Sequence, residues 1–454
     1  MSITPTGPIR RFAAISLCAG ALAAIALPGN RVGLGMVLVA WLAIAGVAVS
    51  GALPRSRYTA LSVVIAATLA AMTGLRDASW LPWMNLTAAA IVVVATAVDA
   101  RTWPALLRAL TTWVRKLLPA PLAVAWFSGI RPGPDTRRRA LPVLRGLALG
   151  WVLLLVFGTL FASADEAFAQ LTDGVLTPDV DLGLVPARVG AGIAVVCICD
   201  AVVLAALAPV GTKSAAHAHG RWSAEWLVAL GLLNALFATF LAVQLRVLFG
   251  GEGYVQDTAG VTYAHYAREG FYQLLAVAFL VLAVIAVAGR RRGKRTGRWP
   301  TPVELLLGLL CVLTLVVLAS ALRRLVGLLE DTYGFTLTRL FGHAGTLWVG
   351  AVLALVGVAG AVRRTDLLPR ALVSMSAAAI LMFSLADPEG LIARENVARY
   401  ERTGKIDTGY LQTLGADATP ALNRLPAPVR ARTGRVEPPA DGLFGLNLAR
   451  VRAR

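Results

Sequence analysis

Eleven apolar stretches, each about long enough to cross a lipid bilayer as a helix, follow one another along this chain. Backbone that lies in lipid must satisfy its own hydrogen bonds, so long unbroken apolar runs form helices there. The runs here are continuous and do not alternate with polar residues, which argues against a membrane-spanning barrel. The sequence therefore predicts an all-α fold, a polytopic transmembrane helical bundle.

The predicted spans cover residues 12–27, 32–53, 58–74, 81–98, 146–161, 189–210, 226–249, 271–288, 303–322, 344–362 and 371–385. Composition agrees with them: 57% of the residues are hydrophobic and 15% are charged, whereas soluble domains are about 45–50% apolar. The first two spans are separated by a very short loop and the last span is short, so counts from 10 to 12 remain open.

The basic loops predict the orientation. Before the C-terminal tail, most Lys and Arg residues fall on the side that holds Arg10 and Arg11, and short cytoplasmic loops carry such an excess. We therefore place the N-terminus in the cytoplasm and, with an odd span count, the C-terminus outside it.

Three regions follow from this topology. Residues 1–385 form the transmembrane region, with a basic cytoplasmic loop at about 99–145. Residues 386–424 are expected to be a short helical extracytoplasmic segment, in which Asp387 and Pro388 start a helix and Gly404 ends it. Residues 425–454, rich in Pro, Arg and Gly, are expected to be a mostly flexible basic tail.

A formal net charge of +18 raises the question of whether the protein binds nucleic acid. The basic residues are spread over several short loops and do not gather on one folded face, which argues against nucleic acid as a partner. Basic loops beside a bilayer attract anionic lipid head groups. The predicted partners are the lipid bilayer, anionic lipids at the cytoplasmic loops and a protein partner.

Familiar catalytic motifs are missing from the sequence. It contains no G-x-x-x-x-G-K-[ST], no H-E-x-x-H and no G-x-S-x-G pattern. His265 and Glu269 have a spacing that metal ligands permit, but one such pair does not define a metal site. We therefore predict no cofactor, no metal and no catalytic residue, and the chain is not expected to be an enzyme.

A cluster of polar and aromatic residues is predicted at the outer face. It combines the start of the span near 271 with two later segments, the loop 330–339 and the first helix of the tail. The same residues would also suit an interfacial helix with tyrosines in the aromatic belt. The candidate residues of this cluster are Tyr263, His265, Tyr266, Arg268, Glu269, Arg339, Asn396 and Tyr400.

A second candidate site lies within the bilayer. Asp200 falls near the middle of the sixth predicted span, and an ionisable group at that depth is costly and therefore a functional candidate. It would either carry a proton or cation, or be protonated and hydrogen-bonded between helices. Asn234 and Gln244, both in the next span, are its predicted partners.

Several motifs in the second half of the chain resemble a known family. They are Q-L-R-V-L-F-G-G at 244–251, Y-A-H-Y-A-R-E-G-F at 263–271, Y-G-F-T-L-T-R at 333–339, and the tail motifs N-V-A-R-Y at 396–400 and T-G-K-I-D at 403–407. The chain resembles the bacterial multi-pass membrane family catalogued as domain of unknown function 4173, which is related to 4153. The resemblance implies a bacterial plasma-membrane location and transfers no catalytic role to any residue.

Three classes of function remain after this reading. Transport or flipping of a small solute or lipid ranks first, because of the number of spans and because of Asp200. A non-enzymatic membrane sensor or assembly partner ranks second, and a membrane enzyme acting on an envelope lipid precursor ranks third. A polar cavity that reaches Asp200 would favour transport, whereas a closed bundle would favour the partner role.

Overall fold

A computed structural model describes residues 7–117, 184–207, 224–249, 263–290, 301–434 and 440–454, and every regular element in these ranges is helical. The predicted all-α fold class is confirmed. The long apolar helices are α1 (Gly7–Ala26), α2 (Leu34–Val49), α3 (Arg57–Leu75), α4 (Leu81–Ala97), α9 (Val185–Ala206), α10 (Ala224–Phe249), α12 (Tyr263–Arg290), α13 (Pro302–Tyr333), α14 (Leu337–Ala361) and α15 (Leu368–Leu385).

Each of these helices coincides with one predicted span, and the remaining prediction, 146–161, lies outside the described residues. Six of them are long and apolar enough to cross a membrane, namely α1, α3, α9, α13, α14 and α15. The others contain shorter apolar segments. The chain is therefore a multi-pass membrane protein. Several helices exceed their predicted spans, and the largest differences are at α12, which begins at Tyr263, α13, which continues to Tyr333, and α14, which begins at Leu337. The helical backbone continues there into polar turns beyond the apolar segment.

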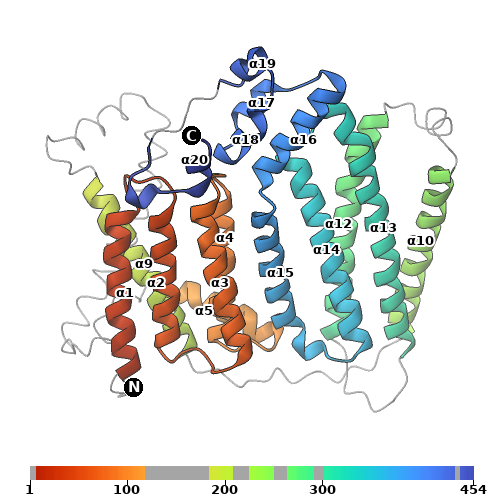
Figure 1. Ribbon diagram of the computed structural model, residues 1–454. Coiled ribbons are helices and arrows are strands. Elements are labelled where there is room, and N and C mark those ends of the chain that lie inside the picture. The colour runs from red at the N-terminus through yellow and green to blue at the C-terminus, as the bar shows by residue number, and fades with distance from the viewer. Residues whose placement is uncertain (1–6, 118–183, 208–223, 250–262, 291–300, 435–439) are drawn as a thin grey trace, which may run out of the picture.

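The long helices stand side by side and alternate in direction (Figure 1). The chain starts at one end of the bundle, here called the N-terminal end, and the residues after α15 lie over the opposite end, here called the cap end. Within the predicted basic loop 99–145, residues Trp103–Leu117 form α5, which crosses behind the lower ends of neighbouring helices in Figure 1. The rest of that loop lies outside the described residues.

The helices pack as two groups. One apolar core joins α1 to α5 with α9 and α15, and a second joins α10, α12, α13 and α14. The groups meet where α14 contacts α15. There the Trp348 indole N–H donates to the Ser376 hydroxyl over 3.0 Å. Close to the cap end, Trp80 lies 5.1 Å from Phe341 and 5.9 Å from Phe383 between ring centroids, which adds an aromatic contact across the same seam.

Helices α1 and α9 approach each other unusually closely. A Cβ atom on Gly20 would lie 2.9 Å from the backbone oxygen of Gly192 and 2.5 Å from a methyl carbon of Val196. A Cβ on Gly192 would likewise lie 2.9 Å from the oxygen of Gly20. Small residues at such crossings let membrane helices pack backbone against backbone. One turn away from Gly20 in α1, Ser16 faces Asp200 of α9.

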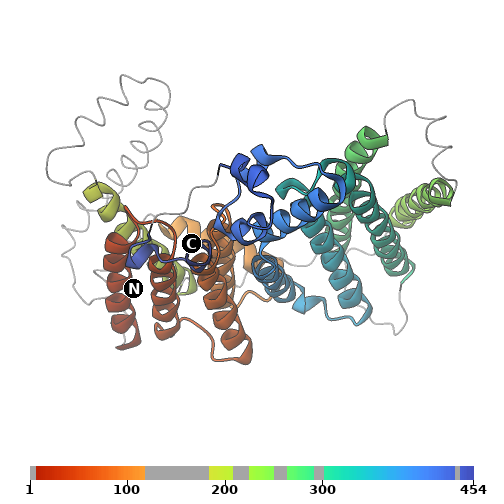
Figure 2. The same cartoon turned by 45° about the horizontal axis from the view of Figure 1, so that its top comes forward.

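The residues after α15 form a small helical layer, the C-terminal cap, defined here as residues 387–434 and 440–454. It contains α16 (Pro388–Thr403), α17 (Thr408–Gln412), η3 (Ala416–Ala418), α18 (Thr419–Leu422), α19 (Ala427–Arg432), η4 (Leu443–Gly445) and α20 (Leu448–Arg452). Its own apolar core includes Ile392, Leu411 and Leu422. Figure 2 shows the cap lying over the middle of the row of helices, across both packed groups.

The ends of α16 are as predicted. Asp387 precedes the helix and its carboxylate accepts from the backbone N–H of Gly390 over 3.2 Å. Gly404 ends it with φ of 70°, a left-handed conformation that suits glycine. Asp407 similarly accepts from the N–H of Tyr410 at the start of α17. These signals are local, which is why the sequence was sufficient to locate them.

The end of the chain departs from the expectation of a mostly flexible tail. Residues 440–454 fold back on the cap end of α2 and α3, where the N–H of Leu34 donates to the oxygen of Leu446 over 2.9 Å. Asn447 and Arg450 are buried, at 0% and 2% relative exposure. A basic, proline-rich composition favours disorder only when its charges have no partners, and these charges find acidic partners in the fold.

Candidate functional site

Buried polar side chains around the loop that follows α3 join the cap to the bundle. These side chains together are here called the cap junction. Arg76 ends α3 and turns its guanidinium towards the cap. Its Nε donates to the Ser384 oxygen over 3.1 Å and its Nη2 to the Leu385 oxygen over 2.9 Å. Its Nη1 lies 3.1 Å from Asp387 and 3.3 Å from Asp417. One side chain therefore binds the end of α15 and two carboxylates of the cap.

Asp77 and Asp417 form a reciprocal pair of contacts with backbone. The N–H of Asp77 donates to the Asp417 carboxylate over 2.7 Å, and the N–H of Ala416 donates to the Asp77 carboxylate over 3.1 Å. The second oxygen of Asp77 accepts from the guanidinium of Arg450. The loop after α3 is thus held from two sides by the cap.

Arg450 is a deeply buried charge of the junction, with a side chain that is 3% exposed. Its Nε contacts both carboxylate oxygens of Asp441 at 3.0 and 2.9 Å, and Nη1 pairs with Asp77. Its Nη2 donates to the oxygen of Val32 over 2.8 Å and also to that of Gly445. A buried guanidinium is tolerated when its donors are satisfied in this way.

Asn447 anchors the same segment through uncharged contacts. Its amide nitrogen donates to the backbone oxygens of Thr73, over 3.3 Å, and of Arg76, over 2.8 Å. Its amide oxygen accepts from the N–H of Ala449 and so caps α20. The last turn of α3, whose carbonyls lack partners within the helix, is therefore completed by the end of the chain.

Glu389 lies in the first turn of α16 and is 5% exposed. Its carboxylate accepts from the backbone N–H of Gly415. Burial, together with the negative charges of Asp417 and Asp77, raises the pKa of Glu389 to about 7. Burial also raises the pKa of Asp417. The buried indole N–H of Trp80, beside this carboxylate, meets no acceptor with hydrogen-bond geometry among the described residues.

The titration of Glu389 predicts a pH dependence of cap docking. Because the pKa is higher in the folded protein than the usual 4.5, the docked state binds the proton more tightly. Docking is therefore strongest below about pH 4.5 and weakens as the pH rises through about 7, by up to about tenfold per pH unit. Hydrogen exchange of the α16–α18 amides at pH 5.5 and 8 measures this.

Glu389→Gln serves as the matched variant for that measurement. Glutamine keeps the shape and stays neutral, so it should flatten most of the pH dependence, leaving the smaller part that comes from Asp417. A pH dependence of equal size in the variant would show that other groups control docking. Glu395→Gln, an exposed change in the same helix, is the control that should behave like the unaltered protein.

The predicted outer-face cluster is only partly described. Tyr263, His265, Tyr266, Arg268 and Glu269 belong to the first turns of α12, and their side chains lie outside the described residues. The other three members, which are described, lie near one another at the cap end.

Asn396 binds the turn between α13 and α14. Its amide nitrogen donates to the oxygens of Phe335, over 2.7 Å, and of Ile392, over 2.8 Å, and its amide oxygen accepts from the N–H of Phe335 over 3.2 Å. Arg339 donates to the oxygen of Gly334 in the same turn. Tyr400 packs against the core of the cap. These residues hold the cap on the turn, and Asn396, at 6% exposure, is not open to a ligand.

Tyr410 adds to this contact and was not among the candidate site residues. Its hydroxyl accepts from the N–H of Leu337, the first residue of α14, over 2.7 Å. Burial raises the pKa of Tyr410 above its usual value. The loop 330–339 and the cap segment 396–410 therefore pack together, as the tyrosine-rich motifs in both segments suggested.

The intramembrane prediction needs one correction. Asp200 is fully buried and accepts from the Ser16 hydroxyl over 3.0 Å, whereas its second oxygen has no partner among the described residues. Asn234 does not pair with it: the amide of Asn234 donates to Leu230 over 2.8 Å and to Leu306 of α13 over 3.1 Å. Neighbouring spans in the sequence belong here to different packed groups. The side chain of Gln244 lies outside the described residues.

The residues of the cap junction were missed as a site. Arg76 and Asp77 form one short polar segment between two spans, and Arg450 is one of many arginines in the tail. The only signal in the sequence was the acidic residue Asp441, which lies within the basic tail that also holds Arg450. Among the described residues, no group of three or more His, Cys, Asp and Glu side chains is arranged to hold a metal ion.

Comparisons with known proteins add a family and no activity. No match was found among curated proteins or among solved structures. A family model described as a domain of unknown function (DUF4153) matches residues 59–425, which include nearly all of the helical bundle after α2 and the cap as far as Leu425. The match supports the resemblance to 4153 and does not show membership of 4173. The chain therefore belongs to the family described as a domain of unknown function, DUF4153.

Proposed function

We propose that the protein is a non-enzymatic membrane protein that acts as an assembly partner, with its C-terminal cap as the binding surface for a protein with an acidic face. The observation that carries this proposal is the cap junction. It holds a helical layer firmly on one end of the bundle through buried charges, and the outer surface of that layer is left exposed.

The exposed surface of the cap is predominantly basic. Its exposed charged residues include Arg394, Glu395, Glu401, Arg402, Lys405, Asp407, Arg424, Arg430 and Arg432. Interfaces commonly pair surfaces of opposite charge, because this raises association rates and selects partners. A basic surface on a rigid support therefore favours an acidic partner. By the positive-inside rule we place the cap on the extracytoplasmic side of a bacterial plasma membrane.

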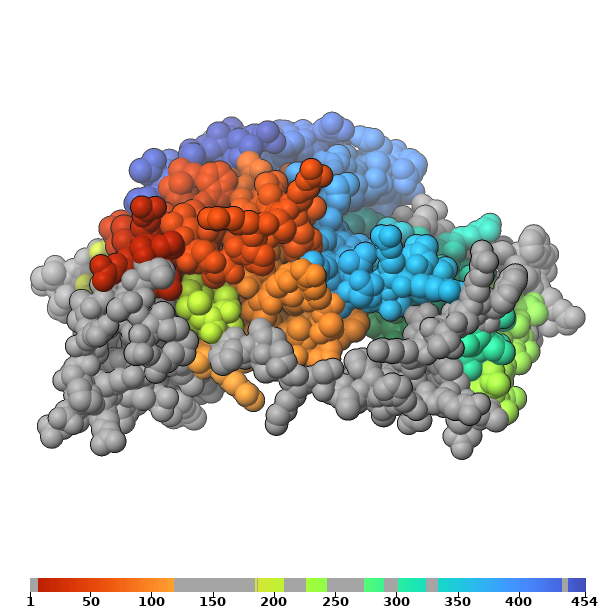
Figure 3. Space-filling view, turned by 90° about the horizontal axis from the view of Figure 1, so that it is seen from below, coloured from red at the N-terminus to blue at the C-terminus, as the bar shows by residue number. Residues whose placement is uncertain are grey.

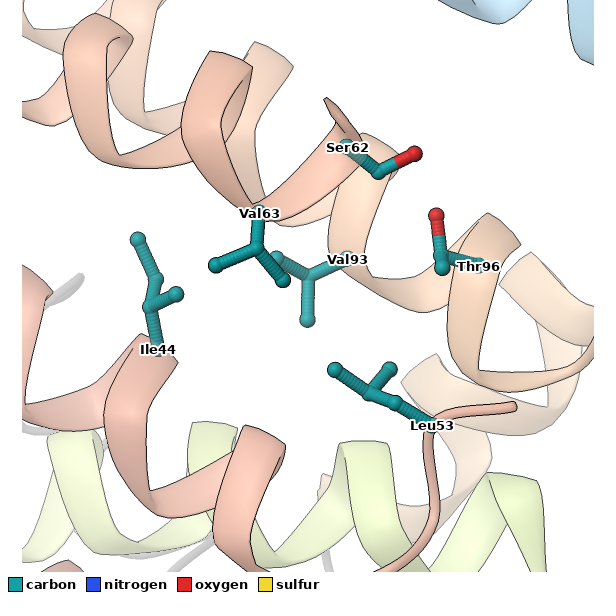
Figure 4. A pocket seen from close by; sticks show the side chains of 6 residues that line it. All are labelled: Ile44, Leu53, Ser62, Val63, Val93 and Thr96. Atoms are coloured by element: carbon teal, nitrogen blue, oxygen red, sulfur yellow. The ribbon is translucent and has the colours of Figure 1, made fainter. Parts of the chain in front are cut away.

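The packing around Asp200 favours a closed bundle over a transport path. The carboxylate is fully buried, and α1 and α9 pack backbone against backbone at the Gly20–Gly192 crossing further along the two helices. A hollow between α2, α3 and α4 has no room for a water molecule; it is lined by Ile44, Leu53, Ser62, Val63, Val93 and Thr96 (Figure 4). Figure 4 shows the two hydroxyls at one side of a largely aliphatic wall.

Crosslinking in the native membrane tests the partner role. A photoreactive amino acid at Pro428 or Glu401, both exposed on the cap, is expected to give a discrete protein adduct. The adduct should disappear when Arg424, Arg430 and Arg432 are changed to Gln, because the charge complementarity is lost. Arg10→Gln with Arg11→Gln, at the opposite end, should retain it. The same photoreactive residue at Leu232, which is 68% exposed on the apolar α10, should give no such adduct.

Transport of a proton or cation is the second candidate, supported by the unpartnered oxygen of Asp200. In vesicles that contain the purified protein, transport would appear as an ion flux that Asp200→Asn abolishes while the Ser16 contact and the fold persist. Such a flux, together with absence of cap adducts, would replace the partner role by transport. Cap adducts that survive in Asp200→Asn, without any flux, would support the partner role.

A further inference from the structure

Helix α5 lies at the N-terminal end of the bundle. Its own surface has three faces of different character. It follows a sharp reversal after α4, in which Asp99 has φ of 51°. It then packs on α9 and α4 and crosses the long helices instead of running along them (Figure 1). One face is buried: Leu106 and Ala109 belong to the core of the first packed group, with Leu110 and Trp113 against it.

A second face of α5 is apolar and exposed. Trp103, Leu107 and Val114 are 43%, 57% and 57% exposed. They are separated by four and seven residues, so they line one side of the helix. Isolated exposed apolar residues are common, but a continuous stripe beside a core-facing stripe needs an apolar environment. Figure 3, which views this end of the molecule, shows the α4–α5 stretch (orange) at the surface.

The third face carries the charges. Arg108 and Arg115 are exposed on the side of α5 away from the core, and the half-buried Thr112 and Lys116 lie beside them. The helix contains no acidic residue. A helix with an apolar face next to a basic face suits the boundary between acyl chains and anionic head groups.

The location of α5 distinguishes a membrane from a soluble partner. It packs on α9, which is long and apolar enough to cross a membrane, so we expect its exposed apolar stripe near the level where the hydrocarbon core ends. Other basic residues lie at this end of the bundle, with Arg55 before α3, Arg57 at its first position, and Arg363 and Arg364 after α14. Positive charge at this level attracts anionic lipids.

We propose that α5 is an interfacial lipid-binding helix: Trp103, Leu107 and Val114 enter the acyl boundary of the adjacent leaflet, while Arg108, Arg115 and Lys116 bind the phosphates of anionic lipids. This site is independent of the partner-binding role proposed for the cap, which lies at the other end of the bundle. It would fix the depth of α4 and α9 relative to the membrane surface.

Fluorescence of the reconstituted full chain tests the location. In a variant with Cys18, Cys197, Cys199 and Cys311 changed to Ala, one cysteine at Leu107 or at Thr112 carries an environment-sensitive dye. In vesicles of phosphatidylcholine with phosphatidylglycerol, the dye at 107 should be quenched by lipids brominated near the head group. The dye at 112 should be quenched by iodide in water. Equal iodide quenching at both positions would overturn the proposal and indicate a face for a soluble partner.

Charge removal tests the lipid class. Arg108→Gln with Arg115→Gln and Lys116→Gln should weaken lipid binding by roughly fivefold per charge removed, so that the fraction of phosphatidylglycerol that gives half of the blue shift at 107 in the unaltered protein no longer does so. Arg10→Gln with Arg11→Gln removes charge from α1 at the same end and should leave this midpoint within twofold. Equal midpoints for the unaltered protein and the α5 variant, or the same blue shift in pure phosphatidylcholine, would refute recognition of anionic lipid.

Discussion

Arg450→Met should release the end of the chain from the bundle and cost about 3–5 kcal/mol of docking free energy. Methionine fills a similar volume but leaves Asp441 and Asp77 buried without their cation, and it leaves the oxygen of Val32 without a donor. Removing one partner from a buried ion pair costs more than the pair itself contributes, because an uncompensated charge remains.

Hydrogen exchange measured by mass spectrometry over residues 441–453 reports this loss directly. A change of 3–5 kcal/mol corresponds to amide exchange faster by about 10²–10⁴-fold, provided that the segment opens as a unit. Arg452→Met is the control, because this arginine is exposed in the same short helix and should leave exchange within about twofold. Similar exchange in both variants would mean that the buried ion pairs do not hold the segment.

Gly20→Val should force α1 away from α9 and lower the stability of the first packed group by at least about 1–3 kcal/mol. The added Cβ would lie 2.5 Å from the Val196 methyl and 2.9 Å from the backbone of Gly192. Backbone cannot yield as a flexible side chain does, so the helices must separate. The Ser16 hydroxyl would then lose its contact with Asp200 one turn away.

Thermal unfolding of the purified protein in detergent measures the cost, and the reactivity of the buried Cys199 towards a thiol reagent reports the separation. Gly231→Val in α10 is the matched control, because a Cβ at that glycine would meet no atom within 4 Å. The control variant has the same change in helix propensity but not the steric clash between helices. If both variants melt alike, the close crossing contributes nothing beyond helix propensity.

The sequence predicted the elements of this fold well because the signals for them are local. Apolar length defines a span, and Asp387 and Gly404 define the ends of α16, without reference to the rest of the chain. The sequence does not show in the same way which helices pack against one another. Asn234 was expected to meet Asp200 from the next span, yet it contacts α13 in the other packed group. Apolar helices carry few side chains that specify their neighbours.

The candidate site shows the same limit more strongly. Arg450 and Val32 are separated by 418 residues, and Arg76 and Asp417 by 341. In the sequence, Arg450 is one basic residue in a basic segment that composition assigns to a mobile tail. Only the folded chain shows that Asp441 and Asp77 surround it. By contrast, the contact between the loop 330–339 and the first helix of the cap was expected from the sequence, and Asn396 makes it through Phe335.

The cap junction also bears on the order in which the protein can be completed during synthesis. The side chains that join α2 and α3 to the end of the chain, Asn447 and Arg450, leave the ribosome after every helix that they bind. The helices of the bundle must therefore be inserted while the end of α3 still lacks these partners. Fixing the loop after α3 is a step that follows translation of the spans, and a nascent chain stopped before residue 441 would present Asp77 without the arginine that neutralises it.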